Sequence, residues 1–245
     1  MEMCLPFTFL CRRIVRCGIW PRAWTTHWIH PLHKKGSKGD VLNFRGIHLT
    51  AQISKAAERF IGTLFVPRLQ RFSAFGVNQF AYSKGRGARD AILFYICSWL
   101  SSFNRGMRVA LYCADVAAAF DRVDAGRLME KLYCKGVHMD ILRILRSWLQ
   151  ARSAYVVVNG VKSTSLTIGN MVFQGTVWGP ILWNIFVEDS RRVVRAHGFT
   201  EGAYADDLNS FKEFPSNLSN HHILNQLEGC QHALHAWGRA LRRGL

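Results

Sequence analysis

The segment EGAYADDLNSFKEF (residues 201–214) places two acidic residues, Asp206 and Asp207, side by side between apolar stretches. These flanks predict two short strands joined at the acidic pair. A solvated surface turn is one interpretation, because Asp is common in turns. The apolar flanks would bury much of the hairpin, however, and two carboxylates held there need a counter-charge such as a hard divalent cation. A third carboxylate nearby would favour a metal site.

A candidate for the third carboxylate ends another expected strand. The segment LYCADVAAAFD (residues 111–121) reads as a buried strand that ends at Asp115. A charge at the end of a buried strand is unusual for packing, although an Asp that caps the following turn or helix is the alternative. If this strand lies next to the acidic hairpin, Asp115 faces Asp206 and the acids form a two-metal site.

The composition points to a polyanionic partner. The chain of 245 residues has 32 Lys and Arg against 16 Asp and Glu, a net charge of +16. Nucleic acid is the first candidate, and a solvated basic surface or anionic lipid are the alternatives. With 49% hydrophobic residues, the chain can build a sizeable core in one or two domains.

The cysteines and histidines give no sign of a disulfide framework or a zinc site. Seven cysteines without a CxxC pair indicate reduced thiols. Neither the group Cys230, His232 and His235 nor the group His27, His30 and His33 completes a four-ligand zinc set. The longest apolar stretch, residues 91–100, is half the ~20 residues of a membrane span, and no signal peptide precedes it. We therefore expect an intracellular chain without a membrane partner, and a piece of a longer protein.

The remaining pattern alternates strands and helices. Strands are expected from Val109 to about Val116 and in two segments joined at Asn159 and Gly160. Helices are expected over residues 51–72 with an end near Pro67, from the basic loop 83–90 through Leu100, over 126–150 with a break near Gly136, over about 180–197 and over about 217–242. This order predicts an α+β fold in which an antiparallel sheet carries helices on one face.

Five ordered blocks carry a family resemblance. DVAAAFDRV (115–123), QGTVWGP (174–180) and YADDLN (204–209) resemble the successive palm motifs of reverse transcriptases. Residues 31–60 and 78–92 are similar to the fingers of non-LTR (LINE-type) retrotransposon enzymes. The resemblance implies a right-hand polymerase with a ferredoxin-like palm. It divides the chain into an N-terminal extension (1–17), fingers (18–108) and a palm with an inserted helical and hairpin finger segment (109–245), truncated before the thumb.

The resemblance also implies a reaction, in which a primer 3′-hydroxyl attacks the α-phosphate of a deoxynucleotide opposite an RNA template. Two Mg²⁺ ions, or Mn²⁺, would stabilise the attacking and leaving oxygens. By resemblance, Asp115 and Asp206 bridge the metals, and the carbonyl of Val116 completes the ligands of the ion on the triphosphate side. Asp207 is then a closer or outer ligand. The implied partners are an RNA template, a DNA primer and dNTPs, and the resemblance specifies no protein partner.

Other residues have implied roles at the nucleotide. Phe120 corresponds to the steric gate that excludes a 2′-hydroxyl, with a core Phe as the alternative. Gln174 would lie beside the nascent base pair and Gly175 would let the strand approach, with an ordinary turn before a helix as the alternative. Trp178 departs from the aliphatic residue common in this motif. The basic candidates, unless they are only solvated, are Lys35 and Arg45 for the triphosphate and Lys34, Lys38, Lys84, Arg86 and Arg89 for nucleic acid.

Family enzymes continue past the position of Leu245 into a lysine-bearing segment, a primer grip and a thumb. We therefore expect this chain to bind template and primer but to extend poorly or not at all alone. An inactive relic that only binds nucleic acid is the alternative. The finger blocks disfavour a telomerase-type or intron-type enzyme. We expect a nuclear protein or a cytoplasmic ribonucleoprotein.

Overall fold

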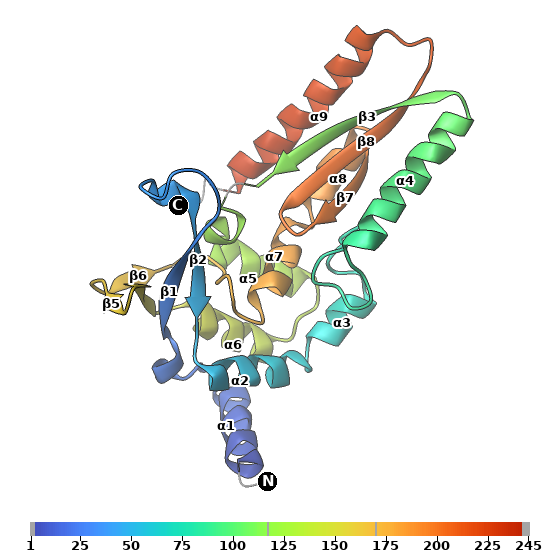
Figure 1. Ribbon diagram of the computed structural model, residues 1–245. Helices are drawn as coiled ribbons and strands as arrows, with labels where there is room; N and C mark the ends of the chain where they lie inside the picture. The colour runs from blue at the N-terminus through green and yellow to red at the C-terminus, as the bar shows by residue number, and fades with distance from the viewer. Residues whose placement is uncertain (1–2, 117, 170, 242–245) are drawn as a thin grey trace. The chain divides into compact units, whose positions relative to one another are not determined.

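The computed structural model describes residues 3–116, 118–169 and 171–241, which form two compact units. Unit 1 joins Met1–Phe72 to Phe120–Ile185, and unit 2 joins Ser73–Ala119 to Phe186–Leu245. Each unit is therefore assembled from two separate stretches of chain. Figure 1 labels their helices and strands.

Unit 1 contains, in its described part, a five-stranded sheet in the order β2-β1-β4-β5, with β6 also paired to β4. Strands β1 and β2 are antiparallel, whereas β1 and β4 are parallel. The strands are β1 (Thr26–His33), β2 (Phe44–Leu49), β4 (Arg152–Val158), β5 (Val161–Lys162) and β6 (Leu166–Ile168). The helices are α1 (Cys4–Cys17), α2 (Gln52–Gly62), α3 (Val66–Arg71), α5 (Ala125–Cys134), α6 (Met139–Leu149) and α7 (Gly179–Val187), the last of which crosses into unit 2. Short 3-10 turns are η1 (Arg22–Trp24), η2 (Val41–Asn43) and η3 (Ala119–Arg122).

One face of this sheet is buried and carries polar side chains. His27 Nε2 and His48 Nδ1 lie 2.7 Å apart in a hydrogen bond. Burial, followed by the charge of Arg152, lowers the pKa of His48 to about 4. Burial, followed by His48 and Arg152, lowers the pKa of His27 to about 3. Both rings are therefore neutral at pH 7, and one donates to the other.

Unit 2 contains, among its described residues, a three-stranded antiparallel sheet in the order β3-β8-β7. Its strands are β3 (Met107–Asp115), β7 (Thr200–Tyr204) and β8 (Asp207–Pro215), and its helices are α4 (Ala88–Asn104), α8 (Ser190–Ala196) and α9 (Asn220–Ala240). Figure 1 shows α9 and α4 running beside the β3 and β8 ribbons. No helix in the described residues is long and apolar enough to cross a membrane.

Helices cover both faces of the unit 2 sheet. Phe214 of β8 belongs to the core cluster that α8 and α9 build with Val194 and Leu234. Phe211, three residues earlier, points to the other face because side chains alternate along a strand. Its ring contacts aromatic residues of α4, including Trp99 at 6.3 Å between ring centroids. The expected helices on one face are thus present, and α4 adds cover on the other.

Several expected elements form, and two expected helices are each divided. The turn at Asn159 and Gly160 has φ values of +50° and +81°, as its sequence predicts, and α5 and α6 are separated near Gly136. Residues 51–72 contain two helices, α2 and α3. Pro67 lies in the first turn of α3 rather than at the end of a helix. Proline is tolerated there because the first N–H groups of a helix need no partner within it. The helix expected over 180–197 is divided into α7 and α8 at Glu188 and Asp189. The last helix ends at Ala240, and Arg242 lies outside the described residues.

Candidate active site

The three candidate acids lie at the same end of the unit 2 sheet. Asp115 ends β3 and is the backbone partner of Asp207, which begins β8. Asp206 lies in the two-residue turn between β7 and β8, and its carbonyl accepts from the N–H of Val116 at 3.4 Å. The expected pairing of Asp115 with Asp206 is therefore shifted by one residue, because the short turn takes Asp206 out of the strand.

The acids also affect one another electrostatically. The pKa of Asp207 is raised by partial burial first, and then by the negative charges of Asp206 and Asp115. Such repulsion would be relieved by a bound cation, and carboxylates are the ligands that Mg²⁺ prefers. In the described parts of the chain, no three His, Cys, Asp or Glu side chains are grouped closely enough to hold a metal ion. The donor types fit a divalent cation, and metal binding stays a prediction.

A buried glutamine holds the turn that carries Asp206. The side chain of Gln79 is completely buried. Its Oε1 accepts from the N–H groups of Ala205 and Ala81, each at 3.2 Å, and its Nε2 donates to the carbonyl of Ala205 at 3.4 Å. Ala205 has a φ of +58°, which residues with a side chain rarely adopt. Gln79 thus satisfies the backbone of a strained turn.

The neighbouring backbone supports the same hairpin. The N–H of Ala203 in β7 donates to the carbonyl of Asn78 at 2.9 Å, and the N–H of Phe80 donates to the carbonyl of Ala203 at 3.0 Å. The side chain of Asn78 donates to the carbonyl of Glu201 at 2.9 Å. Residues 78–80 therefore lie along β7 and fix its position. These residues lie in the block 78–92 that resembles the family's fingers, and the role of Gln79 was not predicted from the sequence.

The loop that carries Gln174 and Gly175 is fixed to β2 in unit 1. The N–H of His48 donates to the carbonyl of Gln174 at 2.8 Å. Gly175 has a φ of +103°, and a Cβ there would lie 2.7 Å from the carbonyl oxygen of His48. Glycine is therefore required for the approach of two backbones within the protein. The predicted approach of a nucleic-acid strand to Gly175 remains untested.

Glu58 of α2 holds the continuation of this loop. Its completely buried carboxylate accepts from the N–H groups of Val177 at 2.7 Å and Trp178 at 3.2 Å. It also accepts from the indole N–H of Trp148 at 3.2 Å, and the indole of Trp178 donates to the backbone carbonyl of Glu58 at 2.7 Å. Burial raises the pKa of Glu58, and these hydrogen bonds and Arg152 oppose the rise. This role of Glu58 was not predicted from the sequence, although an acid between the apolar positions of a helix is a signal.

Trp178, the departure from the family motif, is a core residue. It is 1% exposed, and its ring lies 5.2 Å from the ring of Trp20 and 5.5 Å from that of Trp148 between centroids. The large indole therefore fills space in unit 1 and donates to the backbone carbonyl of Glu58.

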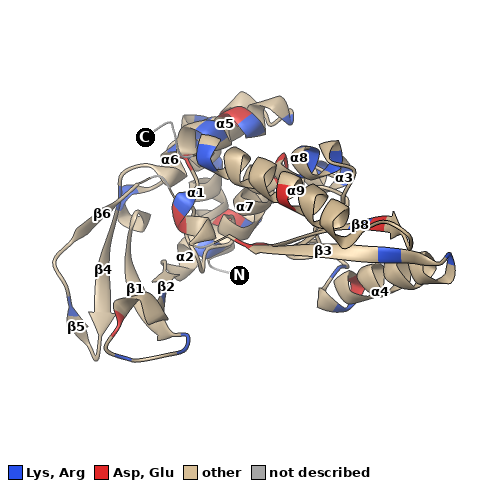
Figure 2. Cartoon of the chain, turned by 90° about the horizontal axis from the view of Figure 1, so that it is seen from above, with Lys and Arg blue, Asp and Glu red and all other residues tan. Residues whose placement is uncertain are grey.

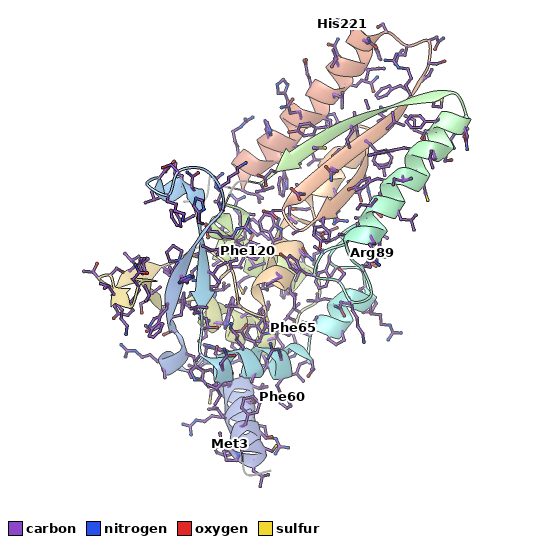
Figure 3. All side chains as sticks on the ribbon, viewed as in Figure 1. Met3, Phe60, Phe65, Arg89, Phe120 and His221 are labelled. Carbon is purple, nitrogen blue, oxygen red and sulfur yellow. The ribbon has the colours of Figure 1, made fainter. Side chains whose placement is uncertain are left out.

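Phe120 is buried in unit 1, as its alternative interpretation expects. Its ring stacks on that of Trp183 with centroids 5.9 Å apart and an interplanar angle of 21°. Its carbonyl accepts from the N–H of Val172 at 2.9 Å. Figure 3 labels Phe120 among the surrounding side chains. The gate role stays a prediction.

The basic candidates lie in exposed segments of both units. Lys34, Lys35 and Lys38 belong to the loop that joins β1 to β2, where Figure 2 shows basic residues in blue, and Arg45 lies exposed on β2. Lys84, Arg86 and Arg89 precede or begin α4, and Figure 3 labels Arg89 there. Arg86 donates to the carbonyl of Val77 and lies over the ring of Phe80 at 5.7 Å. Their exposure is compatible with phosphate contacts, and nothing in the structure distinguishes a triphosphate ligand among them.

Comparison with known families identifies one match over most of the chain. The sequence profile described as "Reverse transcriptase (RNA-dependent DNA polymerase)" matches residues 32–242. The chain is 28% identical over 181 residues to the RNA-directed DNA polymerase from mobile element jockey of Drosophila melanogaster, which covers 72% of this chain and 19% of the relative. It is 26% identical over 186 residues to a probable RNA-directed DNA polymerase from transposon X-element of the same species, a match that covers 76% of this chain and 20% of the relative. The chain thus spans about a fifth of the length of these relatives.

Solved structures support the fold. A telomerase from Candida albicans in complex with a telomeric RNA fragment matches with a TM-score of 0.59 at 14% identity, covering 86% of this chain and 41% of that one. An apo telomerase from Candida tropicalis matches with a TM-score of 0.57 at 13% identity, and the match covers 86% of this chain and 47% of that one. The predicted α+β fold of right-hand polymerases is therefore confirmed, while identities this low carry no information on activity.

Proposed function

Because the chain belongs to the reverse transcriptase family, we propose that it carries the catalytic acids of an RNA-directed DNA polymerase of a retrotransposon. The observation that carries the proposal is the position of Asp115, Asp206 and Asp207 at the same end of the β3-β8-β7 sheet. The proposed substrates are dNTPs and a DNA primer on an RNA template. The division into fingers (18–108) and palm (109–245) stays part of this proposal. The two compact units of the structure have other boundaries.

The residues of the chain have separate tasks in this proposal. Two bound Mg²⁺ or Mn²⁺ ions would acidify the primer hydroxyl and stabilise the charge of the leaving pyrophosphate. Asp115 and Asp206 would hold them, with the carbonyl of Val116 and the carboxylate of Asp207 completing the ligands. Gln79 keeps the Asp206 turn in place through its hydrogen bonds to Ala205. Accurate placement matters, since a misplacement of about 1 Å can cost ~10²-fold in rate.

Primer extension on an RNA template tests the proposal. The assay compares the chain alone with the chain joined to the segment that follows the matched region in a jockey-type relative, each with dNTPs and Mg²⁺ or Mn²⁺. We expect template-dependent DNA synthesis by the joined protein and at least ~10²-fold slower extension by the given chain, because this chain spans about a fifth of the relative and the added segment should help to hold the primer in line. Binding of template and primer without extension by the joined protein would contradict catalysis and favour a relic that only binds nucleic acid.

The gate prediction concerns Phe120. In the joined protein, Phe120→Val should raise the use of ribonucleotides relative to deoxynucleotides by about tenfold or more, measured as the ratio of kcat/KM values, because a clash with the 2′-hydroxyl is removed. Trp183→Phe is the control, since it alters the stacking partner of Phe120 but leaves the Phe120 ring. If both variants lose stability and neither changes the ratio, Phe120 is a packing residue only.

A further inference from the structure

The outer side of α4 is apolar and exposed. Five of its large side chains are 45–60% exposed, and we call them the outer α4 stripe: Ile92, Leu93, Ile96, Leu100 and Phe103. They recur at intervals of three and four residues, so they lie along one side of the helix. The other side of α4 packs on its own sheet, where Phe94, Tyr95 and Trp99 contact Phe211 with ring centroids 6.0–6.3 Å apart.

The middle of α4 carries no charge. Residues 91–104 contain neither Asp, Glu, Lys nor Arg, and Figure 2 shows this part of α4 without blue or red. The basic residues Lys84, Arg86 and Arg89 lie before the helix or in its first turn. In a chain with a net charge of +16, an uncharged surface is where a second copy can approach with least repulsion. A nucleic acid needs cations opposite its phosphates, and the stripe offers none.

The stripe is complementary to itself when its direction is reversed. A two-fold axis between two antiparallel α4 helices would bring Leu93 opposite Leu100 and Ile92 beside Phe103, with Cys97 near the axis. The first turn of each helix would lie beside the last turn of the other, which suits the helix dipoles. The basic N-terminal ends of the two 17-residue helices would be about 25 Å apart, well beyond the ~10 Å over which surface charges interact in salt.

The size of the stripe also fits a second copy. From the exposed fractions of its side chains, it exposes roughly 500 Å², near the upper end of the ~300–600 Å² expected for the largest apolar patch of a monomer. Two paired stripes would bury roughly 1,000 Å², about the least area that a specific interface requires. Leu111 of β3 is 40% exposed and is the partner of Phe211, so it lies on the α4 side of the sheet and adds to this area.

We propose that the outer α4 stripe is a dimer interface, at which α4 packs antiparallel against α4 of a second copy of this chain. The contact is apolar, and its small area gives a weak dimer. The stripe contains none of the residues proposed to bind metal, nucleotide or nucleic acid. Dimer formation can therefore fail while catalysis stands, and the reverse.

Sedimentation equilibrium of the nuclease-treated whole chain tests the proposal. The wild type should be in a monomer–dimer equilibrium at micromolar concentrations. Leu100→Glu should raise the dimer Kd at least ~10²-fold, because each dimer would then bury two unpaired carboxylates, and the milder Leu100→Ala should raise it about tenfold. Leu224→Glu on α9 is the matched control, since Leu224 and Leu100 are both 54% exposed, and it should leave the Kd within twofold.

Cys97 gives a second readout that leaves the apolar residues unchanged. Its thiol is exposed and lies near the proposed axis. Bismaleimidoethane, whose two maleimides each add one thiolate, should therefore join Cys97 of one copy to Cys97 of the other. Cys97→Ser should remove the cross-linked dimer, whereas Cys134→Ser, which removes an exposed cysteine of α5, should leave it.

Salt distinguishes an apolar interface from association through bound nucleic acid. Raising NaCl from about 0.1 M to about 0.5 M should maintain or tighten the dimer, because it screens repulsion between two basic chains, whereas a complex bridged by nucleic acid would dissociate. A monomeric wild type, equal Kd values in Leu100→Glu and Leu224→Glu, or cross-linking that persists in Cys97→Ser would overturn the proposal. So would a monomeric joined protein whose Cys97 is protected from maleimide, because the added segment would then cover the stripe.

Discussion

Replacing Asp206 by Asn should lower primer extension by the joined protein about 10³-fold, because the substitution removes a charged ligand from the site where charge develops in the transition state. Asp115→Asn should have a similar effect. The side chains keep their shape, so the loss concerns charge rather than packing. Rates from single-turnover extension on an RNA template measure it.

The same substitution should act in the opposite direction on stability. Since Asp206 and Asp115 raise the pKa of Asp207, removing one charge relieves repulsion in the metal-free protein. The Tm of Asp206→Asn without metal should therefore equal or exceed that of the wild type, and the stabilisation by Mg²⁺ should disappear. Glu213→Gln, at the other end of β8 and paired with Arg105 at the surface, is the matched control. If Glu213→Gln and Asp206→Asn extend primers equally, the site assignment is wrong.

Replacing Glu58 by Ala should cost about 3–5 kcal/mol of the free energy of unfolding. The change leaves the N–H groups of Val177 and Trp178 and the indole of Trp148 without their acceptor. It also removes the negative charge near Arg152, whose pKa burial lowers to about 10 against the effect of Glu58. Each buried group without a partner is costly, and a buried cation costs more. Urea unfolding of the whole chain, followed by tryptophan fluorescence, measures the loss.

Two variants distinguish the loss of the Glu58 hydrogen bonds from a general effect of removing an acid. Glu58→Gln keeps one acceptor oxygen and should lose less stability than Glu58→Ala. Asp140→Ala removes a surface acid that pairs with Arg143 on α6 and should leave the free energy of unfolding almost unchanged. A loss no larger in Glu58→Ala than in Asp140→Ala would show that Glu58 does not hold the Gln174 loop.

The local parts of the candidate site could be predicted from the sequence. Asp115 and the Asp206–Asp207 pair each lie beside a short apolar pattern that identifies a strand end or a turn, and both signals extend over only a few residues. The Asn159–Gly160 turn is equally local. The exact register was not predictable, because a shift of one residue between β3 and β8 depends on how many residues the hairpin turn holds.

The supporting residues could not be predicted because their partners are remote. Gln79 bonds to a residue 126 positions away, and Glu58 bonds to one 120 positions away. Nothing in a single sequence distinguishes a buried glutamine from an exposed one. The parallel pairing of β1 with β4 was missed for the same reason, since the pattern of alternating strands and helices favoured an antiparallel sheet.

The two-stretch construction of each unit has a consequence during protein synthesis. Thr26 of β1 and Ser153 of β4 touch across 127 positions, so a ribosome adding ~5–20 residues per second needs roughly 6–25 s to deliver the partner strand. Strand β3 likewise emerges well before β8. Throughout that interval the nascent chain exposes open strand edges and uncovered apolar faces, which are the features that chaperones bind and that promote aggregation. Translation speed between codons 72 and 186 should therefore govern how much chain reaches the native state.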